Sequence, residues 1–576
     1  MKRLVAGLLG LVAAVLSCGA HADVAPASAP AAAPAAATPA PRAMVAAANP
    51  LAAAAGLKVL RAGGSAIDAA VAVQAVLGLV EPQSSGLGGG AFMVYYDART
   101  HRVTAYDGRE TAPAGATPDL FLQADGKPMP FLQAILSGHS AGVPGAVAML
   151  YLAHREHGAR PWRSLFADAT ALAQNGFVVS PRLAGMIVSR APQASAPDAV
   201  RYFSRPDGTR LVAGDVLKNP AYAATLRRLA AEGPNALLRG QVAADIVRRL
   251  HEDPLPSSMT LADLAGYRPH ESEALCRPYR VLIVCSAQAP SGGPAVLEGL
   301  GLLERTDIAT RGPGDAQAWL QLALAQQLMY ADRDAFEGDP AFVSFPLEGL
   351  LAPDYLTDRA RLIGDHAFAA PPAHGHPAGA PPVGGDASAE PGGTSHFVVV
   401  DAKGNVVSMT TTVESIFGDG RMVDGFFLNN QLTDFSFIPK DAAGVPMANA
   451  PAPGKRPRSS MAPVIVLDQN HRFVAALGSP GGNAIPAFVL KSLVGVLDWR
   501  LSMQDAFALP NLVARGPNVS SEADRYQPGV VDALAAKGLT MRPAGGEGSG
   551  LHGVIVRPGG YEGGADPRRE GVALGY

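Results

Sequence analysis

Hydrophobic residues follow a helical pattern in the first folded stretch of the chain. Residues 51–61 are rich in Ala and Leu, and they are followed by Gly63 and Gly64. Ser65 then precedes a second apolar run that continues to about Val80, just before a proline. Because Ser is a favoured N-cap and both Gly and Pro end helices, this spacing predicts two consecutive helices.

A glycine-rich turn comes next and leads into a strand. EPQSSGLGGGAFMVYYD carries three glycines at positions 88–90, ahead of β-forming residues from Phe92 to Tyr96. A phosphate-binding loop would instead open a helix and would be followed by Lys and Ser or Thr. The pattern therefore favours a tight backbone turn inside the core.

A long segment without hydrophobic periodicity interrupts the second half of the chain. Helical patterns alternate with Pro-rich breaks from about residue 144 to residue 350. Residues 368–393 (FAAPPAHGHPAGAPPVGGDASAEPGG) are then rich in Pro, Ala and Gly. This composition predicts a flexible linker. Inside a compact protein, such a stretch serves as a lid, a linker or a processing site.

Alternating residues directly after the linker predict a β-hairpin, SHFVVVD-AKG-NVVSMTTTV. Asp401 suits the first position of a type I turn, and Gly404 suits the left-handed position of a three-residue loop. If Asp401 pairs with Asn405, Thr394 lies directly opposite Thr412. A two-residue loop would shift this register by one. VIVLDQNHRFVAALGSPGG predicts a second hairpin.

Composition narrows the classes of protein and of partner. The 576 residues allow two to four ordinary domains or one large interleaved domain. A hydrophobic content of 48% with 17% charged residues is typical of a globular protein. The formal net charge of −3 provides no basic field for nucleic acid or anionic lipid, so a small-molecule partner is expected.

The N-terminus has the layout of a secretory signal peptide. Two basic residues precede the apolar run 4–16, and Ala-His-Ala at 20–22 forms a small-residue cleavage site. The apolar run is too short to span a bilayer. We therefore expect a signal peptide over residues 1–22, an Ala/Pro-rich spacer over 23–42, and a periplasmic or secreted protein. Val-Leu-Ser-Cys ending at Cys18 loosely resembles a lipobox, which leaves lipid anchoring open.

Export would expose the two remaining cysteines to an oxidising compartment. Cys276 and Cys285 end the segment CRPYRVLIVC, which reads as a hairpin turning at its middle. The two cysteines would then be directly opposed, and we predict a disulfide bond between them.

Ten segments in order resemble the γ-glutamyltranspeptidase family. They are GGSAIDAAVAV, GLGGGAFMV, DGRETAP, GVPGAVA, YADRDAFEGDPAFV, GGTSHFVVVD, FLNNQLTDFS, KRPRSSMAP, LGSPGGNAI and the closing DPRREG-GY. The resemblance covers some 530 residues of the chain.

The resemblance implies an α/β fold, the αββα four-layer sandwich of N-terminal-nucleophile hydrolases, built as one interleaved domain. It also implies a precursor that cuts itself between Gly393 and Thr394. The products would be a large subunit, 43–393, and a small catalytic subunit, 394–576, held together as a heterodimer. The implied substrates are a γ-glutamyl donor such as glutathione and either water or an amino acid or peptide acceptor. No cofactor, metal, nucleic acid or membrane span is expected.

The cut has a chemical purpose. A threonine hydroxyl is a weak nucleophile at neutral pH unless a base takes its proton. Cleavage before Thr394 frees an α-amino group on the same residue, with an ordinary pKa near ~8. The nucleophile thereby acquires its own base.

Other roles follow from the resemblance alone. Thr412 would hydrogen-bond Thr394 and orient it. The N–H groups of Gly481 and Gly482 would form the oxyanion hole, where a carbonyl must approach the backbone closely. GSPGG is also a plain turn sequence, and both interpretations are compatible.

The remaining implied roles concern a zwitterionic substrate. Arg109 would grip the substrate α-carboxylate with a bidentate fork, and Ser459 and Ser460 would donate hydrogen bonds to it. Asp434, helped by Gln431, would receive the substrate α-ammonium.

Two features depart from the family's best-known pattern. Glu414 stands where many members have Asn, and residues 438–458 include no aromatic residue that could act as a lid. By strand alternation, Glu414 faces the same side as Thr412. A buried carboxylate should meet a cation, and the candidates are the substrate ammonium and Arg109.

Two other functions stay open. One is an acylase on the same fold that removes glutaryl-type side chains, which lack the α-ammonium. The other is an inactive secreted binding protein, for which an intact precursor would be evidence.

Overall fold

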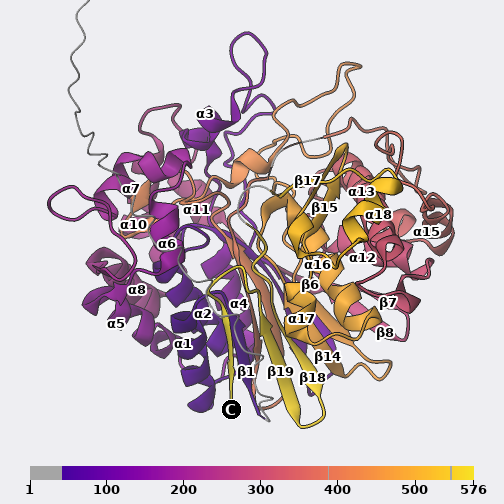
Figure 1. Ribbon diagram of the computed structural model, residues 1–576. Helices are drawn as coiled ribbons and strands as arrows, with labels where there is room; N and C mark the ends of the chain where they lie inside the picture. The colour runs from indigo at the N-terminus through magenta and orange to yellow at the C-terminus, as the bar shows by residue number, and fades with distance from the viewer. Residues whose placement is uncertain (1–41, 387, 389, 545–547) are drawn as a thin grey trace, which may run out of the picture. The chain divides into compact units, whose positions relative to one another are not determined.

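Two antiparallel β-sheets pack against each other in the computed structural model, which describes residues 42–386, 388, 390–544 and 548–576 (Figure 1). The first sheet has the order β20 (Val572–Gly575), β1 (Met44–Ala47), β9 (Ser395–Val400), β10 (Val406–Thr412), β2 (Gly90–Asp97), β3 (Arg102–Asp107) and β6 (His270–Glu273). The second has the order β19 (Gly560–Ala565), β18 (His552–Arg557), β14 (Phe473–Gly478), β13 (Val464–Leu467), β8 (Leu282–Ser286) and β7 (Leu275–Tyr279). The predicted signal peptide, Cys18 and all but the last residue of the spacer lie outside the described residues.

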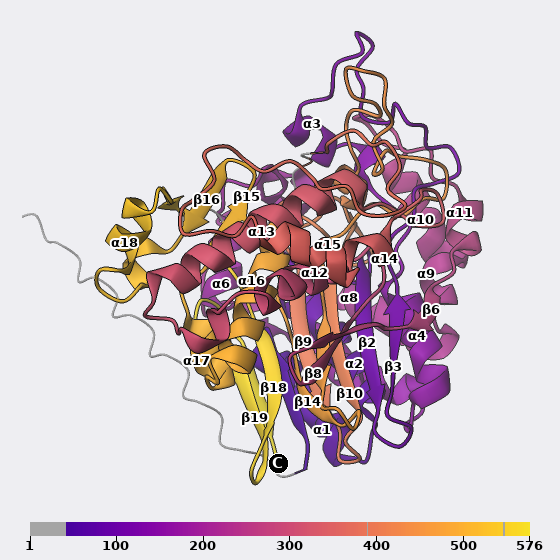
Figure 2. The ribbon, with the colours of Figure 1, turned by 90° about the vertical axis from the view of Figure 1, so that its right-hand side faces the viewer.

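Side-chain alternation along β9 divides the interior into two cores. Phe397 and Val399 pack among residues of the helices α1 (Pro50–Arg61), α2 (Ala66–Val80) and α4 (Ala146–His157). Val398 and Val400 point the other way, into a core shared with the second sheet. That core also contains residues of α12 (Gly293–Glu304), α13 (Ala316–Phe336) and α16 (Ile485–Leu493). Helices therefore cover the outer face of each sheet, and Figure 2 shows α12 and α13 in front of the second one.

The remaining helices of at least six residues surround this framework. They are α5 (Ala167–Asn175), α6 (Pro181–Ile187), α7 (Pro197–Tyr202), α8 (Pro220–Glu232), α10 (Gly240–Leu250), α11 (Leu261–Gly266), α15 (Pro353–Ala360), α17 (Met503–Ala508) and α18 (Val530–Ala536). The two N-terminal helices agree with the sequence pattern. Ser65 caps α2, because its hydroxyl oxygen accepts the Asp68 N–H at 3.2 Å. The Asp68 carboxylate in turn accepts the Ser65 N–H, which completes a capping box.

The predicted register of the β9–β10 hairpin is confirmed. Val400 pairs with Val406, and Ser395 pairs with Thr411. The Asp401 N–H donates to the Asn405 carbonyl at 3.0 Å, and a glycine with φ +85° completes the turn. The same register brings the residue just before β9 opposite the last residue of β10.

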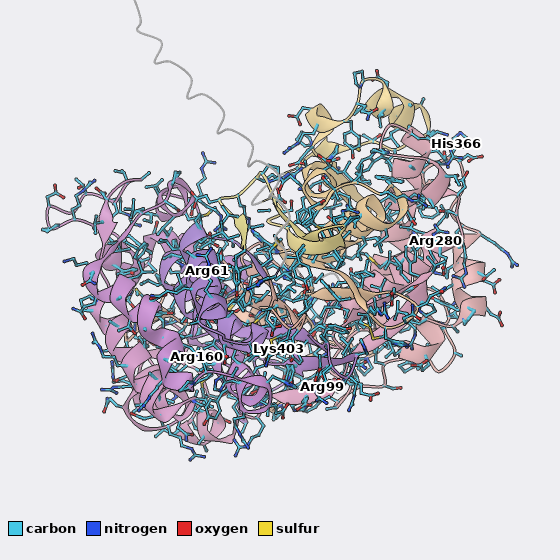
Figure 3. The ribbon with its side chains drawn as sticks, turned by 90° about the horizontal axis from the view of Figure 1, so that it is seen from below. Arg61, Arg99, Arg160, Arg280, His366 and Lys403 are labelled. Atoms are coloured by element: carbon cyan, nitrogen blue, oxygen red, sulfur yellow. A yellow bond between two sulfur atoms is a disulfide. The ribbon has the colours of Figure 1, made fainter. Side chains whose placement is uncertain are left out.

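The hairpin of β7 and β8 holds the predicted disulfide. Cys276 and Cys285 are directly paired and joined by an S–S bond, with their Cα atoms 4.0 Å apart. The turn falls at residues 280–281, as the symmetry of the segment predicted. Figure 3 shows Arg280, in this turn, at the opposite side of the view from Arg61 at the end of α1.

The predicted linker has no helix or strand among its described residues, 368–386, 388 and 390–393. Polar contacts nevertheless hold it at several points. Asp332 accepts the Gly375 N–H at 2.6 Å, and Asp386 accepts the Ser436 hydroxyl at 2.6 Å. In the part of the chain that the structure describes, no helix is both long and apolar enough to cross a membrane.

Candidate active site

One small cavity collects residues that lie far apart in the sequence. It is lined by Arg109, Glu390, Pro391, Thr394, Thr412, Glu414, Gln431, Asp434, Ser459, Ser460, Met461, Gly482 and Ile485. Almost every predicted site residue is therefore present in one place. Gly481 instead lines two neighbouring cavities. No cluster of three or more His, Cys, Asp or Glu among the described residues could hold a metal ion.

Thr394 lies directly before β9 in a strained backbone conformation. Its hydroxyl donates to the Thr412 hydroxyl at 3.0 Å, and the Thr412 oxygen also accepts the Glu414 N–H at 2.7 Å. The Thr394 φ of +83° is rare for a β-branched residue and costs about 1–3 kcal/mol. Gly393 precedes it because a Cβ there would lie 1.8 Å from the Glu414 carbonyl oxygen. The peptide bond between them is thus tightly confined and is followed directly by the strained φ of Thr394.

Gly481 and Gly482 follow β14 and both adopt positive φ angles, +136° and +57°. A Cβ on Gly482 would lie 2.1 Å from the Glu390 carbonyl oxygen. Glycine is required here, because the chain before the predicted cut passes directly over this backbone.

Asp434 lies on the short 3₁₀ turn Gln431–Asp434 and pairs with Arg109 across 325 positions of sequence. Arg109 Nη2 lies 2.6 Å from Asp434 Oδ2, which also accepts Gln431 Nε2 at 2.7 Å. The two residues that were predicted to bind the substrate thus contact each other directly. Asp434 Oδ1 and Gln431 Oε1 are buried and accept no hydrogen bond from a described residue. Two such acceptors suit a positively charged N–H donor.

Burial controls the ionisation of Asp434. Removal from water raises the pKa of Asp434 to about 6, although Arg109 acts in the opposite direction. The carboxyl group of Asp434 therefore changes its charge near pH 6.

Glu414 reaches the cavity by a different route from the predicted one. The alternation argument was wrong, because β10 ends at Thr412 and Glu414 has a φ of +79°. Its carboxylate accepts hydrogen bonds from Ser415 Oγ and Asn430 Nδ2, and among the described residues it forms no ion pair with Arg109, one of its two predicted partners. Burial, and then the charge of Asp434, raise the pKa of Glu414 well above its usual range.

The two predicted serines differ in their contacts. Ser459 Oγ accepts the Met461 N–H at 3.1 Å. Ser460 Oγ accepts from Arg333 Nη2 at 2.8 Å and donates to the Glu390 carboxylate. The sequence interpretation gave no role to Arg333 or Glu390. Arg333 lies in YADRDAFEGDPAFV, so the motif itself was the available signal.

The chain is similar to known proteins over most of its length. The sequence profile of the family Gamma-glutamyltranspeptidase matches residues 52–576. The chain is 35% identical over 544 residues to "Glutathione hydrolase proenzyme" of Bacillus subtilis (strain 168), covering 92% of this chain and 91% of that protein. It is 32% identical over 531 residues to "Acylase ACY 1 proenzyme" of Pseudomonas sp. (strain SE83), covering 90% of each. The crystal structure of cephalosporin acylase from Bacillus halodurans is similar with a TM-score of 0.82 and 26% identity, covering 94% of this chain and 96% of that one.

Proposed function

Because the chain belongs to the gamma-glutamyltranspeptidase family and is an enzyme of that kind, we propose that it cuts itself and then transfers γ-glutamyl groups. Thr394 is the proposed nucleophile, and glutathione and related γ-glutamyl amides are the proposed donors. The observation that carries this proposal is the 3.0 Å contact between the Thr394 and Thr412 hydroxyls in a cavity that also contains Arg109 and Asp434.

The proposed cut divides the chain into subunits 43–393 and 394–576, which stay together as a heterodimer. The strain at Thr394 supports a cut at this bond, because cleavage releases the residue from its positive φ. Strand β9 of the small subunit lies between β1 of the large subunit and β10, so both products share one sheet. We propose that the two packed sheets and their outer helices are the αββα sandwich of N-terminal-nucleophile hydrolases. Export by a signal peptide at 1–22 stays part of the proposal.

The reaction uses the freed α-amino group of Thr394 as a base. This amine takes the hydroxyl proton while the oxygen attacks the γ-carbonyl carbon, and the N–H groups of Gly481 and Gly482 stabilise the oxyanion. The proton then passes to the leaving amine, which leaves a γ-glutamyl ester on Thr394. Water releases glutamate from this ester, and an amino acid or peptide instead yields a new γ-glutamyl amide.

An acylase is the second candidate, because acylases are among the similar proteins. The unpaired acceptors on Asp434 and Gln431 favour the γ-glutamyl donor, since a glutaryl group has no ammonium to meet them. Release of p-nitroaniline from γ-glutamyl-p-nitroanilide and from glutaryl-p-nitroanilide tests the choice. Faster turnover of the glutaryl compound would favour the acylase. A lack of both cleavage and turnover would favour the inactive binding homologue.

The dependence of activity on pH should report on Asp434. Its pKa of about 6 means that the carboxylate is charged above this pH and protonated below it. Affinity for the donor ammonium is therefore present above about pH 6 and is lost as the pH falls. Protonation of the Thr394 amine lowers turnover of γ-glutamyl- and glutaryl-p-nitroanilide alike, so we expect the ratio of their kcat/KM values to fall about tenfold for each unit below the pKa of Asp434. Glutaryl-p-nitroanilide has no ammonium, and an identical acidic limb for both compounds would contradict the assignment.

Glu414 should sharpen the choice of donor. It lines the cavity near Asp434, and a bound substrate ammonium would favour the charged forms of both carboxyl groups, whose pKa values are raised in its absence. We expect Glu414→Gln to shrink the preference for the γ-glutamyl over the glutaryl compound about tenfold, a loss of ~1.4 kcal/mol of discrimination. The ratio of the two kcat/KM values measures this preference. An unchanged ratio would leave Glu414 a purely structural role with Ser415 and Asn430.

A further inference from the structure

Glu390 places a carboxylate in the cavity from within the chain, four residues before the proposed cut. Arg333 Nη2 lies 2.9 Å from Glu390 Oε1 and 3.2 Å from Oε2, and Ser460 Oγ donates to Oε2. Arg458 Nε lies 3.5 Å from Oε1. With this side chain in place, the cavity has room for about one water molecule.

The backbone of Glu390 is fixed as well. The Asn483 N–H donates to the Glu390 carbonyl oxygen at 3.1 Å. With its amide oriented to satisfy both groups, the Asn483 side chain donates to the same oxygen and accepts the Glu390 N–H at 3.2 Å. Hydrogen bonds to both the side chain and the backbone of Glu390 thus hold its carboxylate in the cavity.

The site around this carboxylate is built for an anion. The side chains of Arg333 and Arg458 are fully buried. Arg458 Nη2 also lies 3.3 Å from Asp386 Oδ2, so this guanidinium faces a second carboxylate besides that of Glu390. Burial alone would raise the pKa of Glu390, but Arg333 and Arg458 outweigh it and lower the pKa to about 2. The internal ligand is therefore charged at every pH relevant to the enzyme.

The hydroxyl of Ser460 cannot serve two carboxylates at once. A serine has one O–H donor, and in the uncut chain that donor is committed to Glu390. Its oxygen meanwhile accepts from Arg333. A donor carboxylate can use Ser460 only after Glu390 has moved away.

We propose that Arg333, Arg458 and Ser460 form a carboxylate site that Glu390 occupies in the uncut chain. After the segment ending at Gly393 has left, the same site would receive the donor α-carboxylate together with Arg109 and Ser459, which line the same cavity. The second half of this proposal rests on the proposed function. Before the cut, the same site anchors the tightly confined peptide bond. After the cut, departure of Glu390 opens it, so that maturation and donor binding share one set of side chains.

The first part of the proposal, that Glu390 occupies the carboxylate site, is tested on the uncut chain and needs no catalysis. The double variant Thr394→Ala/Glu390→Ala leaves a cavity the size of a carboxylate. Sodium acetate is the probe. Acetamide has the same shape without the charge, and sodium chloride controls for ionic strength. We expect saturating acetate to raise the melting temperature by about 2 °C and acetamide to leave it unchanged. Thr394→Ala alone should not respond to acetate.

Two outcomes would refute the claim that Glu390 occupies the carboxylate site. One is that acetate and acetamide change the melting temperature of the double variant equally. The other is that acetate changes the melting temperature of Thr394→Ala, which keeps Glu390, by the same amount. If the double variant does not fold, the self-cleavage rates of Glu390→Gln and Glu390→Asp decide instead. Loss of the anchor predicts cleavage about tenfold slower with Gln than with Asp, and equal rates would refute the anchor. Glu348→Gln, an exposed carboxylate on another surface, is the matched control.

The second part of the proposal, that the donor α-carboxylate binds at this site after the cut, is tested on the cut wild-type enzyme. The peptide Ser-Ala-Glu-Pro-Gly-Gly should inhibit γ-glutamyl-p-nitroanilide turnover competitively, and the same peptide with Gln should be about tenfold weaker. Equal inhibition by both peptides would show that the donor carboxylate binds elsewhere. If the enzyme does not turn over γ-glutamyl-p-nitroanilide at all, the proposed function fails, while the acetate result still decides whether Glu390 occupies a carboxylate site.

Discussion

Thr394→Ala is expected to remain one uncut and inactive chain. The substitution removes the hydroxyl that is proposed to attack the Gly393 carbonyl, and the Thr412 hydroxyl belongs to the last residue of the neighbouring strand β10. We expect turnover of γ-glutamyl-p-nitroanilide to fall by at least about 10³-fold. A denaturing gel of the wild type should instead give two bands, the smaller of which begins with Thr394 on N-terminal sequencing.

Two controls separate the nucleophile from general damage to the strand. Thr394→Ser keeps a hydroxyl and should still be cut, though more slowly. Thr411→Ala removes a buried hydroxyl from the position of β10 next to Thr412. That hydroxyl donates to the Gly90 carbonyl at 3.4 Å and does not contact Thr394, so this variant controls for the loss of a buried hydroxyl from the strand. Normal cleavage of Thr394→Ala would refute the assignment of the nucleophile.

Asp434→Asn is expected to produce the largest loss of substrate recognition without loss of the nucleophile. The substitution keeps the size of the side chain but removes the charge that is proposed to meet the donor ammonium. Losing one partner of a buried charge pair costs roughly 2–5 kcal/mol, so kcat/KM for γ-glutamyl-p-nitroanilide should fall about 30-fold to several thousand-fold. Turnover of glutaryl-p-nitroanilide should change far less.

The same substitution also removes the charged partner of Arg109, so stability must be measured in parallel. Asp419→Asn is a matched control, because Asp419 forms a buried ion pair with Arg421 at 3.1 Å outside the cavity. It should lower the melting temperature without changing the ratio of the two substrates. Parallel losses on both substrates in Asp434→Asn would show that its role is structural.

Local chemistry accounts for what could be predicted from the sequence. Ser65 and the glycines before it set the start of α2, since a cap acts within one turn of its own residue. The turn at Asp401–Gly404 fixed the pairing that brings Thr394 to Thr412, since strand register is set by the turn. The Cys276–Cys285 pair followed from the same symmetry.

Only the tertiary structure decided which side chains of the cavity bond to one another. Arg109 and Asp434 were each assigned to the substrate, yet they bond to each other across 325 residues, which no local pattern can encode. Strand alternation failed at Glu414, because the strand ends two residues earlier and the backbone turns through a positive φ. Glu390 looked like one more polar residue of a linker, and only the packing of α13 and the segment around Ser460 shows that its carboxylate is seated against Arg333. The sequence therefore determined the family, the caps and the hairpins, since these depend on neighbours within a few residues, whereas the pairing of buried charges depends on how two sheets and their helices pack.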